Sequence, residues 1–206
     1  MNLSQLPFTE LLKAFQSREP TPGGGSASAL GGAVGASLLA MVAGLPKPRA
    51  ERIEDTERLT AAGARCAAIG DSLAALIDRD SRAYDLVVAA FRLPKSTEEE
   101  QAARGTRIQE ALRAATEAPL EIMRACAEAI GLAAVVAAFG NRNAVSDVRV
   151  GLELLRAGLL GAKLNVDVNL ANIKDEIFVA AVRREAEHLV GEGEREASTA
   201  ASEPKL

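Results

Sequence analysis

The chain of 206 residues contains no tryptophan, one tyrosine, one histidine and two cysteines. Aromatic residues make up only 3% of it, so its core must be built from Ala, Leu, Val and Ile, which favours closely packed helices. His188 stands alone, and Cys66 and Cys126 are far apart, so no cluster of metal ligands is expected. We predict no metal and no cofactor, and two buried, reduced thiols rather than a disulfide.

An excess of positive charge is also lacking. The 24 Lys and Arg residues face 28 Asp and Glu residues, which argues against nucleic acid as a partner. The most apolar stretch, residues 27–45, is rich in glycine, ends at Pro46 and lacks a basic segment before it, which argues against a membrane span or signal peptide. We therefore expect a cytoplasmic protein, and its hydrophobic content of 48% fits one globular domain.

Apolar residues recur at steps of three and four along most of the chain, as in amphipathic helices. No segment has the alternation typical of a strand, so the sequence predicts a single-domain, all-α bundle of long antiparallel helices over residues 1–190. Ser96 and Glu99 are spaced as a capping box, and Pro119 is expected to kink or interrupt its helix. Residues 191–206 are expected to form a disordered tail. The predicted helices span about 7–17, 27–45, 50–92, 96–139, 146–173 and 175–189.

Thr21-Pro22-Gly23-Gly24-Gly25-Ser26 is the most informative segment. Glycine permits a tight turn and close approach of another group, and the first amides of the following helix point out of its positive end. The segment is either a cradle for a carboxylate or polarised oxygen, or a place where two helices touch. A phosphate loop is excluded because the Gly-Lys-Ser/Thr ending is missing.

Asp80 lies on the apolar stripe of the third long helix, four residues after Leu76 and four before Tyr84. A buried, unpaired charge is costly, so such a residue has a specific partner or lines a cavity. We expect Asp80 to belong to a site, and the neighbouring Asp78 to be a solvated surface acid.

Asn165, Asn169 and Asn172 fall at i, i+4 and i+7 and share one helical face. Asparagine is a poor helix former with a donor and an acceptor to satisfy, so this face contacts either a ligand or another helix or subunit. Gly140-Asn141 and Ser146-Asp147 form a turn followed by a residue pair suited to start a helix.

Four blocks, taken together in this order, resemble the cyclodeaminase/cyclohydrolase family of folate enzymes. That family includes formimidoyltetrahydrofolate cyclodeaminase domains and stand-alone methenyltetrahydrofolate cyclohydrolases. The resemblance covers about residues 5–185 and implies an all-helical homodimer that acts on a one-carbon derivative of tetrahydrofolate. The blocks are Thr-Pro-Gly-Gly-Gly-Ser at 21–26, Asp-x-x-Ala-Tyr at 80–84 with Leu-Pro-Lys at 93–95, Gly-Asn-x-Asn-x-x-Ser-Asp at 140–147, and Gly-Ala-x-x-Asn-Val-x-x-Asn-Leu at 161–170.

The resemblance also implies roles for individual residues. Asp80 or Asp147 is expected to stabilise the cation and relay a proton. Where relatives carry a lysine-rich patch, this chain has Lys47 and Arg49, one of which is expected to meet the anionic benzoyl-glutamate tail. The residues implied to bind substrate are Gly23, Gly24, Gly25, Ser26, Lys47, Arg49, Asn141, Ser146, Asn165 and Asn169.

Two reactions fit the family, and both pass through a tetrahedral carbon attached to N5 and N10. The cyclohydrolase adds water to 5,10-methenyltetrahydrofolate and opens it to 10-formyltetrahydrofolate. The cyclodeaminase closes formiminotetrahydrofolate and releases ammonia. We favour the cyclohydrolase, because these 206 residues include no formiminotransferase domain to supply a formimino group. The remaining alternative is a helical oligomerisation module without activity.

Overall fold

The structure, a computed structural model, describes residues 2–202 and confirms the all-α fold. Within that range, no strand is present, and the only pairing of that kind is one isolated bridge between Pro48 and Asn141. The elements are η1 (Leu3–Gln5), α1 (Phe8–Phe15), α2 (Gly24–Gly44), α3 (Ile53–Phe91), α4 (Glu98–Phe139), η2 (Arg142–Ala144), α5 (Val145–Leu170) and α6 (Glu176–Ser202).

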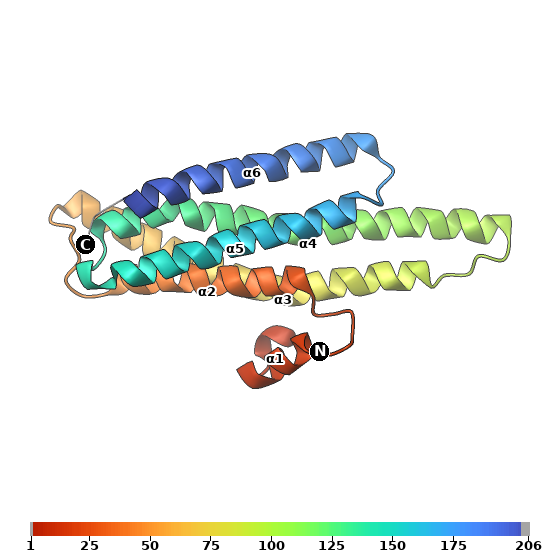
Figure 1. Ribbon diagram of the computed structural model, residues 1–206, viewed down its shortest axis with the longest axis horizontal. Helices are drawn as coiled ribbons and strands as arrows, with labels where there is room; N and C mark the ends of the chain where they lie inside the picture. The colour runs from red at the N-terminus through yellow and green to blue at the C-terminus, as the bar shows by residue number, and fades with distance from the viewer. Residues whose placement is uncertain (1, 203–206) are drawn as a thin grey trace.

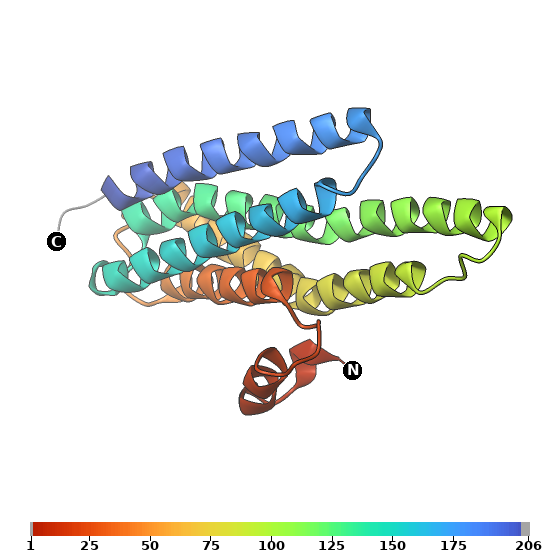
Figure 2. The same ribbon diagram turned by 45° about the vertical axis from the view of Figure 1, so that its right-hand side comes forward.

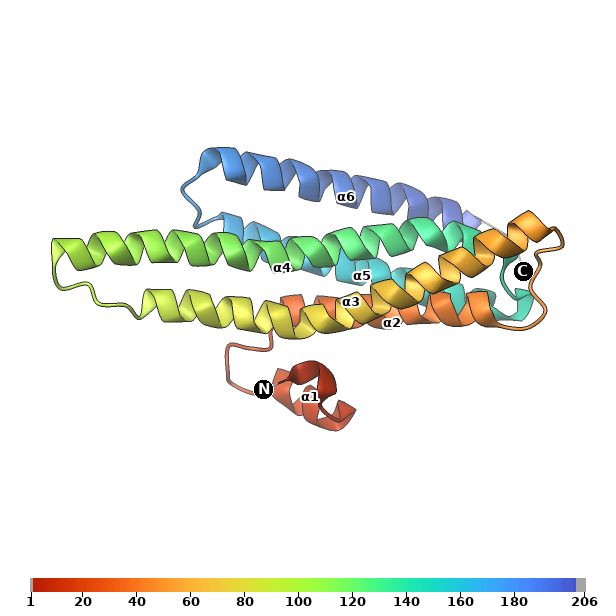
Figure 3. The same cartoon turned by 180° about the vertical axis from the view of Figure 1, so that it is seen from behind.

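Four helices form the bundle. Helix α2 packs against α3 and α5, and α4 packs against α3, α5 and α6 (Figures 1 and 3). Small residues let α2 and α5 approach closely, since a Cβ on Gly35 would lie 2.6 Å from the carbonyl oxygen of Gly151. Aliphatic side chains from all four helices fill the core, as the composition predicts, including Leu39, Leu73, Met123 and Leu155.

Helices α3 and α4 are much longer than their neighbours and project beyond the point where α2 begins and α5 ends (Figures 1 and 2). The capping box of α4 lies one residue later than predicted, with Thr97 as the cap and Glu100 as its partner. Pro119 does not split the helix, because α4 runs unbroken from Glu98 to Phe139 with Pro119 buried inside it.

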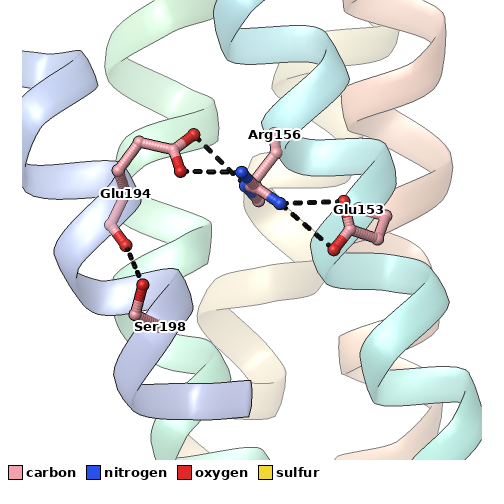
Figure 4. A network of polar contacts seen from close by, with 4 residues as sticks. All are labelled: Glu153, Arg156, Glu194 and Ser198. Atoms are coloured by element: carbon pink, nitrogen blue, oxygen red, sulfur yellow. Dashed lines mark hydrogen bonds and ion pairs between the residues drawn. The ribbon is translucent and has the colours of Figure 1, made fainter.

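Residues 191–202 do not form the expected tail but continue α6, while 203–206 lie outside the described residues. The segment is rich in Glu and Ala, which favour helix, and Ala197 and Ala200 are buried. Arg156 of α5 links α5 to α6 by donating a hydrogen bond to Glu194 of α6 at 2.7 Å, and it also donates to Glu153 within α5 (Figure 4). Apolar contact and this ion pair together hold the end of α6 on the bundle.

The expectation that Asp78 is a surface acid is wrong. Its side chain is buried, and its carboxylate accepts hydrogen bonds from the backbone N–H groups of Leu3 and Ser4. Burial works to raise the pKa of Asp78, but the hydrogen bonds from Leu3 and Ser4 outweigh it and lower the pKa. Asp78 therefore fastens the N-terminal segment to α3, while α1 lies outside the four-helix bundle (Figure 1).

Two helices, α2 and α4, are long and apolar enough to cross a membrane by length and composition. In both, nearly half of the most apolar stretch is buried inside the bundle. The core helix of a soluble protein meets the same criterion, so this property alone is weak evidence for a membrane span.

Candidate functional site

A cleft of about 230 Å³ lies where α2 begins and α5 ends, beside the last third of α3 and the middle of α4. It brings together four groups that the sequence singled out separately: the glycine turn, Asp80, Asn165 and Asn169. The cleft is lined by Pro20, Thr21, Gly23, Gly24, Gly25, Asp80, Tyr84, Ala115, Asn165, Val168 and Asn169.

The glycine turn leaves space for the carboxylate of Asp80. A Cβ built on Gly25 would lie 2.2 Å from Oδ1 of Asp80 and 2.5 Å from its Cγ, so no side chain fits there while Asp80 keeps its position. The hydroxyl of Ser26 donates to Oδ2 of Asp80 at 3.0 Å and also lies 2.9 Å from the carbonyl oxygen of Ile77. Asp80 is therefore held at the amino-terminal end of α2, whose first turn has no acidic residue of its own.

Burial raises the pKa of the Asp80 carboxyl above its ordinary value, and hydrogen bonds from the hydroxyl and backbone N–H of Ser26 only partly offset this effect. Such a carboxyl takes up a proton more readily than an exposed one, which is the property required of a general acid or base. Because Asp80 lines the cleft, its carboxyl could exchange a proton with a ligand bound there.

The two asparagines are oriented by backbone carbonyl groups. Nδ2 of Asn165 donates to the carbonyl oxygen of Gly161 at 2.9 Å, and Nδ2 of Asn169 donates to that of Ala115 at 3.0 Å. Ala115 is four residues before Pro119, which has no N–H, so its carbonyl lacks the usual helical partner and is available to Asn169. Within residues 2–202, no group donates a hydrogen bond to Oδ1 of Asn165 or to Oδ1 of Asn169. Both oxygens can therefore accept hydrogen bonds from a ligand in the cleft.

The other predicted site residues lie at the opposite end of α2 and α5. We name Lys47, Arg49, Asn141, Ser146 and Asp147 the far-end cluster. Helix α2 has 21 residues, so at 1.5 Å per residue about 30 Å separates this cluster from the cleft. Within one chain, the cleft and the far-end cluster do not form a common site.

The far-end cluster is an ordered turn. The N–H of Arg49 donates to the carbonyl oxygen of Phe139 at 2.8 Å, and the side-chain amide of Asn141 donates to that of Pro46. Lys47 has a φ of 57°, a left-handed conformation uncommon for a residue with a side chain. Ser146 and Asp147 do not cap α5, because its N-cap is Ala144 and Asp147 lies in its first turn.

Several residues that line the cleft were not predicted from the sequence as site residues. Pro20 and Thr21 precede the glycines, and Val168 lies between the two asparagines. Tyr84 was named in the apolar stripe and in the block at residues 80–84 but was not predicted to line the site, although its i, i+4 spacing from Asp80 places both on one face and could have identified it. Asn172, the third member of the predicted ladder, lies beyond the end of α5 and does not line the cleft.

A half-buried carboxyl, two amide oxygens and one tyrosine suit a flat, polar, nitrogen-containing ligand that donates hydrogen bonds. Among residues 2–202, no group of three His, Cys, Asp or Glu residues could hold a metal ion. The arrangement can bind such a ligand and exchange a proton with it through Asp80.

The chain matches known proteins over most of its length. It is 41% identical to a methenyltetrahydrofolate cyclohydrolase of Methylorubrum extorquens over 88% of this chain and 87% of that protein. It is 32% identical to the pig formimidoyltransferase-cyclodeaminase, of which it covers only 36%. A crystal structure of formiminotetrahydrofolate cyclodeaminase from Thermotoga maritima superposes with a TM-score of 0.81 at 27% identity, covering 97% of this chain and 96% of that one. Residues 7–188 match the family model described as formiminotransferase-cyclodeaminase. The chain therefore belongs to the formiminotransferase-cyclodeaminase family.

Proposed function

We propose that the protein hydrolyses 5,10-methenyltetrahydrofolate to 10-formyltetrahydrofolate. The observation that carries this proposal is the carboxyl of Asp80, half-buried in the cleft against Gly25 and Ser26 with a raised pKa. The 41% identity to a protein named methenyltetrahydrofolate cyclohydrolase, over most of both chains, supports this substrate.

In this proposal, the methenyl bridge carbon of the substrate lies near Asp80. The carboxylate stabilises the cationic bridge and takes a proton from the attacking water as the C–O bond forms. Asp80 then returns that proton to N5, and the bond between N5 and the bridge carbon breaks. The hydroxyl on that carbon releases its remaining proton to solvent as the C=O bond of the formyl group on N10 forms. The amide oxygens of Asn165 and Asn169 accept hydrogen bonds from the pterin ring and orient it.

The second candidate is the cyclodeaminase reaction, which the close match to the Thermotoga cyclodeaminase fold favours. Its tetrahedral carbon carries NH2 where the cyclohydrolase has OH, so the same residues would serve both reactions.

One spectrophotometric experiment separates the two candidates. The methenyl compound has a chromophore that both 10-formyltetrahydrofolate and formiminotetrahydrofolate lack. Purified protein is mixed with methenyltetrahydrofolate or with formiminotetrahydrofolate. We expect the chromophore of the first substrate to disappear faster than in buffer. Appearance of the chromophore from the second, with release of ammonia, would instead support the cyclodeaminase. Absence of both changes would refute the proposed function.

A further inference from the structure

Ser26 lies behind Asp80 and does not line the cleft. Its side chain is fully buried, whereas Asp80 is half-buried and forms part of the cleft wall. A ligand in the cleft therefore meets the carboxyl of Asp80 but not the hydroxyl of Ser26. Any effect of Ser26 on a bound ligand has to pass through Asp80.

The Ser26 hydroxyl has three polar neighbours but only one proton. Its Oγ lies 2.9 Å from the carbonyl oxygen of Ile77, 3.0 Å from Oδ2 of Asp80 and 3.2 Å from Oγ of Ser81. A carbonyl oxygen and a carboxylate oxygen only accept hydrogen bonds, so the proton of Ser26 can serve one of them at a time. Ser81 differs from both, because its hydroxyl can donate to Ser26.

The hydroxyl of Ser81 depends on this contact. Ser81 is buried, and within residues 2–202 its hydroxyl has no side-chain partner other than Ser26. The carbonyl of Ile77 accepts from the backbone N–H of Ser81 in the regular pattern of α3, so it does not require Ser26. Every group is satisfied when Ser81 donates to Ser26 and Ser26 donates to Oδ2 of Asp80. Hydrogen bonds in such a chain polarise one another, which strengthens the bond to the carboxylate.

The two oxygens of Asp80 are therefore not equivalent. Oδ2 accepts from Ser26, while Oδ1 has no side-chain donor within residues 2–202. A proton on Oδ2 would displace the hydrogen bond from Ser26, so a proton taken from water is carried on Oδ1. Oδ2 then becomes the carbonyl oxygen of the carboxylic acid and still accepts from Ser26. When N5 of the substrate takes the proton, the O–H bond at Oδ1 breaks and the carboxylate is restored.

Few charged groups face Asp80. Within residues 2–202, Tyr84 is the only other titratable side chain that lines the cleft, and α2 carries no charged residue. The raised pKa of Asp80 is the balance of burial, which raises it, against hydrogen bonds from Ser26, which lower it. Charged side chains near the cleft-lining residues in sequence interact with other groups: Arg79 with Glu121, Arg82 with Asp78, Asp85 with Thr21, Glu117 with Arg124, and Lys163 with Asp167.

We infer that Ser26 and Ser81 are positioning residues for Asp80: their paired hydroxyls hold Oδ2 as a hydrogen-bond acceptor throughout turnover and leave Oδ1 to exchange the proton with the substrate. The inference rests on the proposed function for the reaction, and on the buried hydroxyl pair for the residues.

The first test needs no substrate. NMR of the carboxyl carbons follows the titration of Asp80 in the wild-type protein and in Ser26→Ala, and Asp80→Asn identifies its signal. Removal of the hydroxyl takes a donor from the ionised carboxylate, so the pKa of Asp80 should rise further. Ser81→Ala acts through Ser26 and should shift the titration in the same direction by a smaller amount.

Ser28→Ala is the matched control. Ser28 is also buried in α2, but its hydroxyl donates to the carbonyl oxygen of Gly24 and not to Asp80. This change should leave the titration of Asp80 as it is in the wild-type protein.

Activity provides the second test. The value of kcat/KM should fall on the acid side as Asp80 of the free protein becomes protonated, and this limb should move to higher pH in Ser26→Ala. At a pH above the limb, kcat should fall about 3- to 10-fold, as expected for loss of one hydrogen bond to the reacting group. KM should stay unchanged, because Ser26 does not line the cleft.

Three results would overturn the inference. If the hydroxyl pair only joins α2 to α3, Ser26→Ala lowers the melting temperature but leaves the titration of Asp80 and the acid limb unchanged. If Ser26→Ala raises KM and leaves kcat unchanged, Ser26 binds the substrate directly. If Ser26→Ala does not fold, an unchanged titration of Asp80 in Ser81→Ala has the same force. A wild-type protein inactive on both folates refutes the proposed function instead, while the titration still decides whether the pair acts on Asp80.

Discussion

Replacing Gly25 by alanine should disable the protein by displacing Asp80. The added Cβ would lie 2.2 Å, 2.5 Å and 2.6 Å from Oδ1, Cγ and Oδ2 of Asp80, distances at which atoms overlap. The carboxylate must move away and lose its hydrogen bond from Ser26. Overpacking of this kind costs about 1–3 kcal/mol of unfolding free energy. For a chain of this size, the melting temperature should fall by roughly 2–12 °C.

The loss of activity should exceed what the stability change explains, because a misplaced catalytic group costs about 10²-fold in rate. Turnover of methenyltetrahydrofolate and thermal unfolding are measured on the same preparation. Gly131→Ala is the matched control, since a Cβ at Gly131 of α4 meets no atom within 4 Å. That change should be neutral or stabilising by up to about 1 kcal/mol.

A double-mutant cycle identifies the cause. In a chain that already carries Asp80→Ala, the same change at Gly25 meets no carboxylate, so its cost in stability should shrink. The reasoning is refuted if Gly25→Ala is as stable and as active as Gly131→Ala, or if its cost is the same with and without Asp80.

Three further changes test other parts of the structure. Gly35→Ala should lower the unfolding free energy by about 2 kcal/mol or more, because the added Cβ would lie 2.6 Å from the backbone oxygen of Gly151. Wild-type stability in chemical denaturation would contradict this close approach of α2 and α5. The lowered pKa of Asp78 means that its contribution to stability is present above its unfolded pKa and is lost as pH falls through its folded pKa. Asp78→Asn should therefore flatten the acid side of a plot of melting temperature against pH, and an unchanged slope would argue against this role. Asn165→Ala should raise the KM for methenyltetrahydrofolate about tenfold with little change in melting temperature, since its amide oxygen has no partner within residues 2–202; an unchanged KM would remove Asn165 from the binding site.

The helices could be predicted from the sequence because apolar spacing and glycine or proline breaks mark them directly. The effect of Pro119 could not be predicted, since the cost of a proline inside a helix depends in part on whether a neighbouring helix can use the carbonyl that it leaves free. Here Nδ2 of Asn169, which comes from α5, donates to that carbonyl of Ala115. The end of α6 was missed because buried Ala197 and Ala200 are too small to produce a strong apolar pattern.

The cleft could be predicted in part. A carboxylate on an apolar stripe and two asparagines four residues apart stood out because burial of polar groups is costly. Asp78 had no such signal, because its partners are the backbone N–H groups of Leu3 and Ser4, about 75 positions away in the sequence. The separation of Asp80 from Asp147 also could not be predicted, since motif order along the chain does not say at which end of a bundle each motif lies.

The rate at which the Asp80→Asn protein consumes methenyltetrahydrofolate tests the central claim most directly. A raised pKa means that ionised Asp80 lowers stability at neutral pH, so the neutral amide should leave the melting temperature unchanged or higher. We predict a folded protein whose turnover is lower by about 10²–10⁴-fold. A folded Asp80→Asn protein that works at the wild-type rate would contradict the role of this carboxyl.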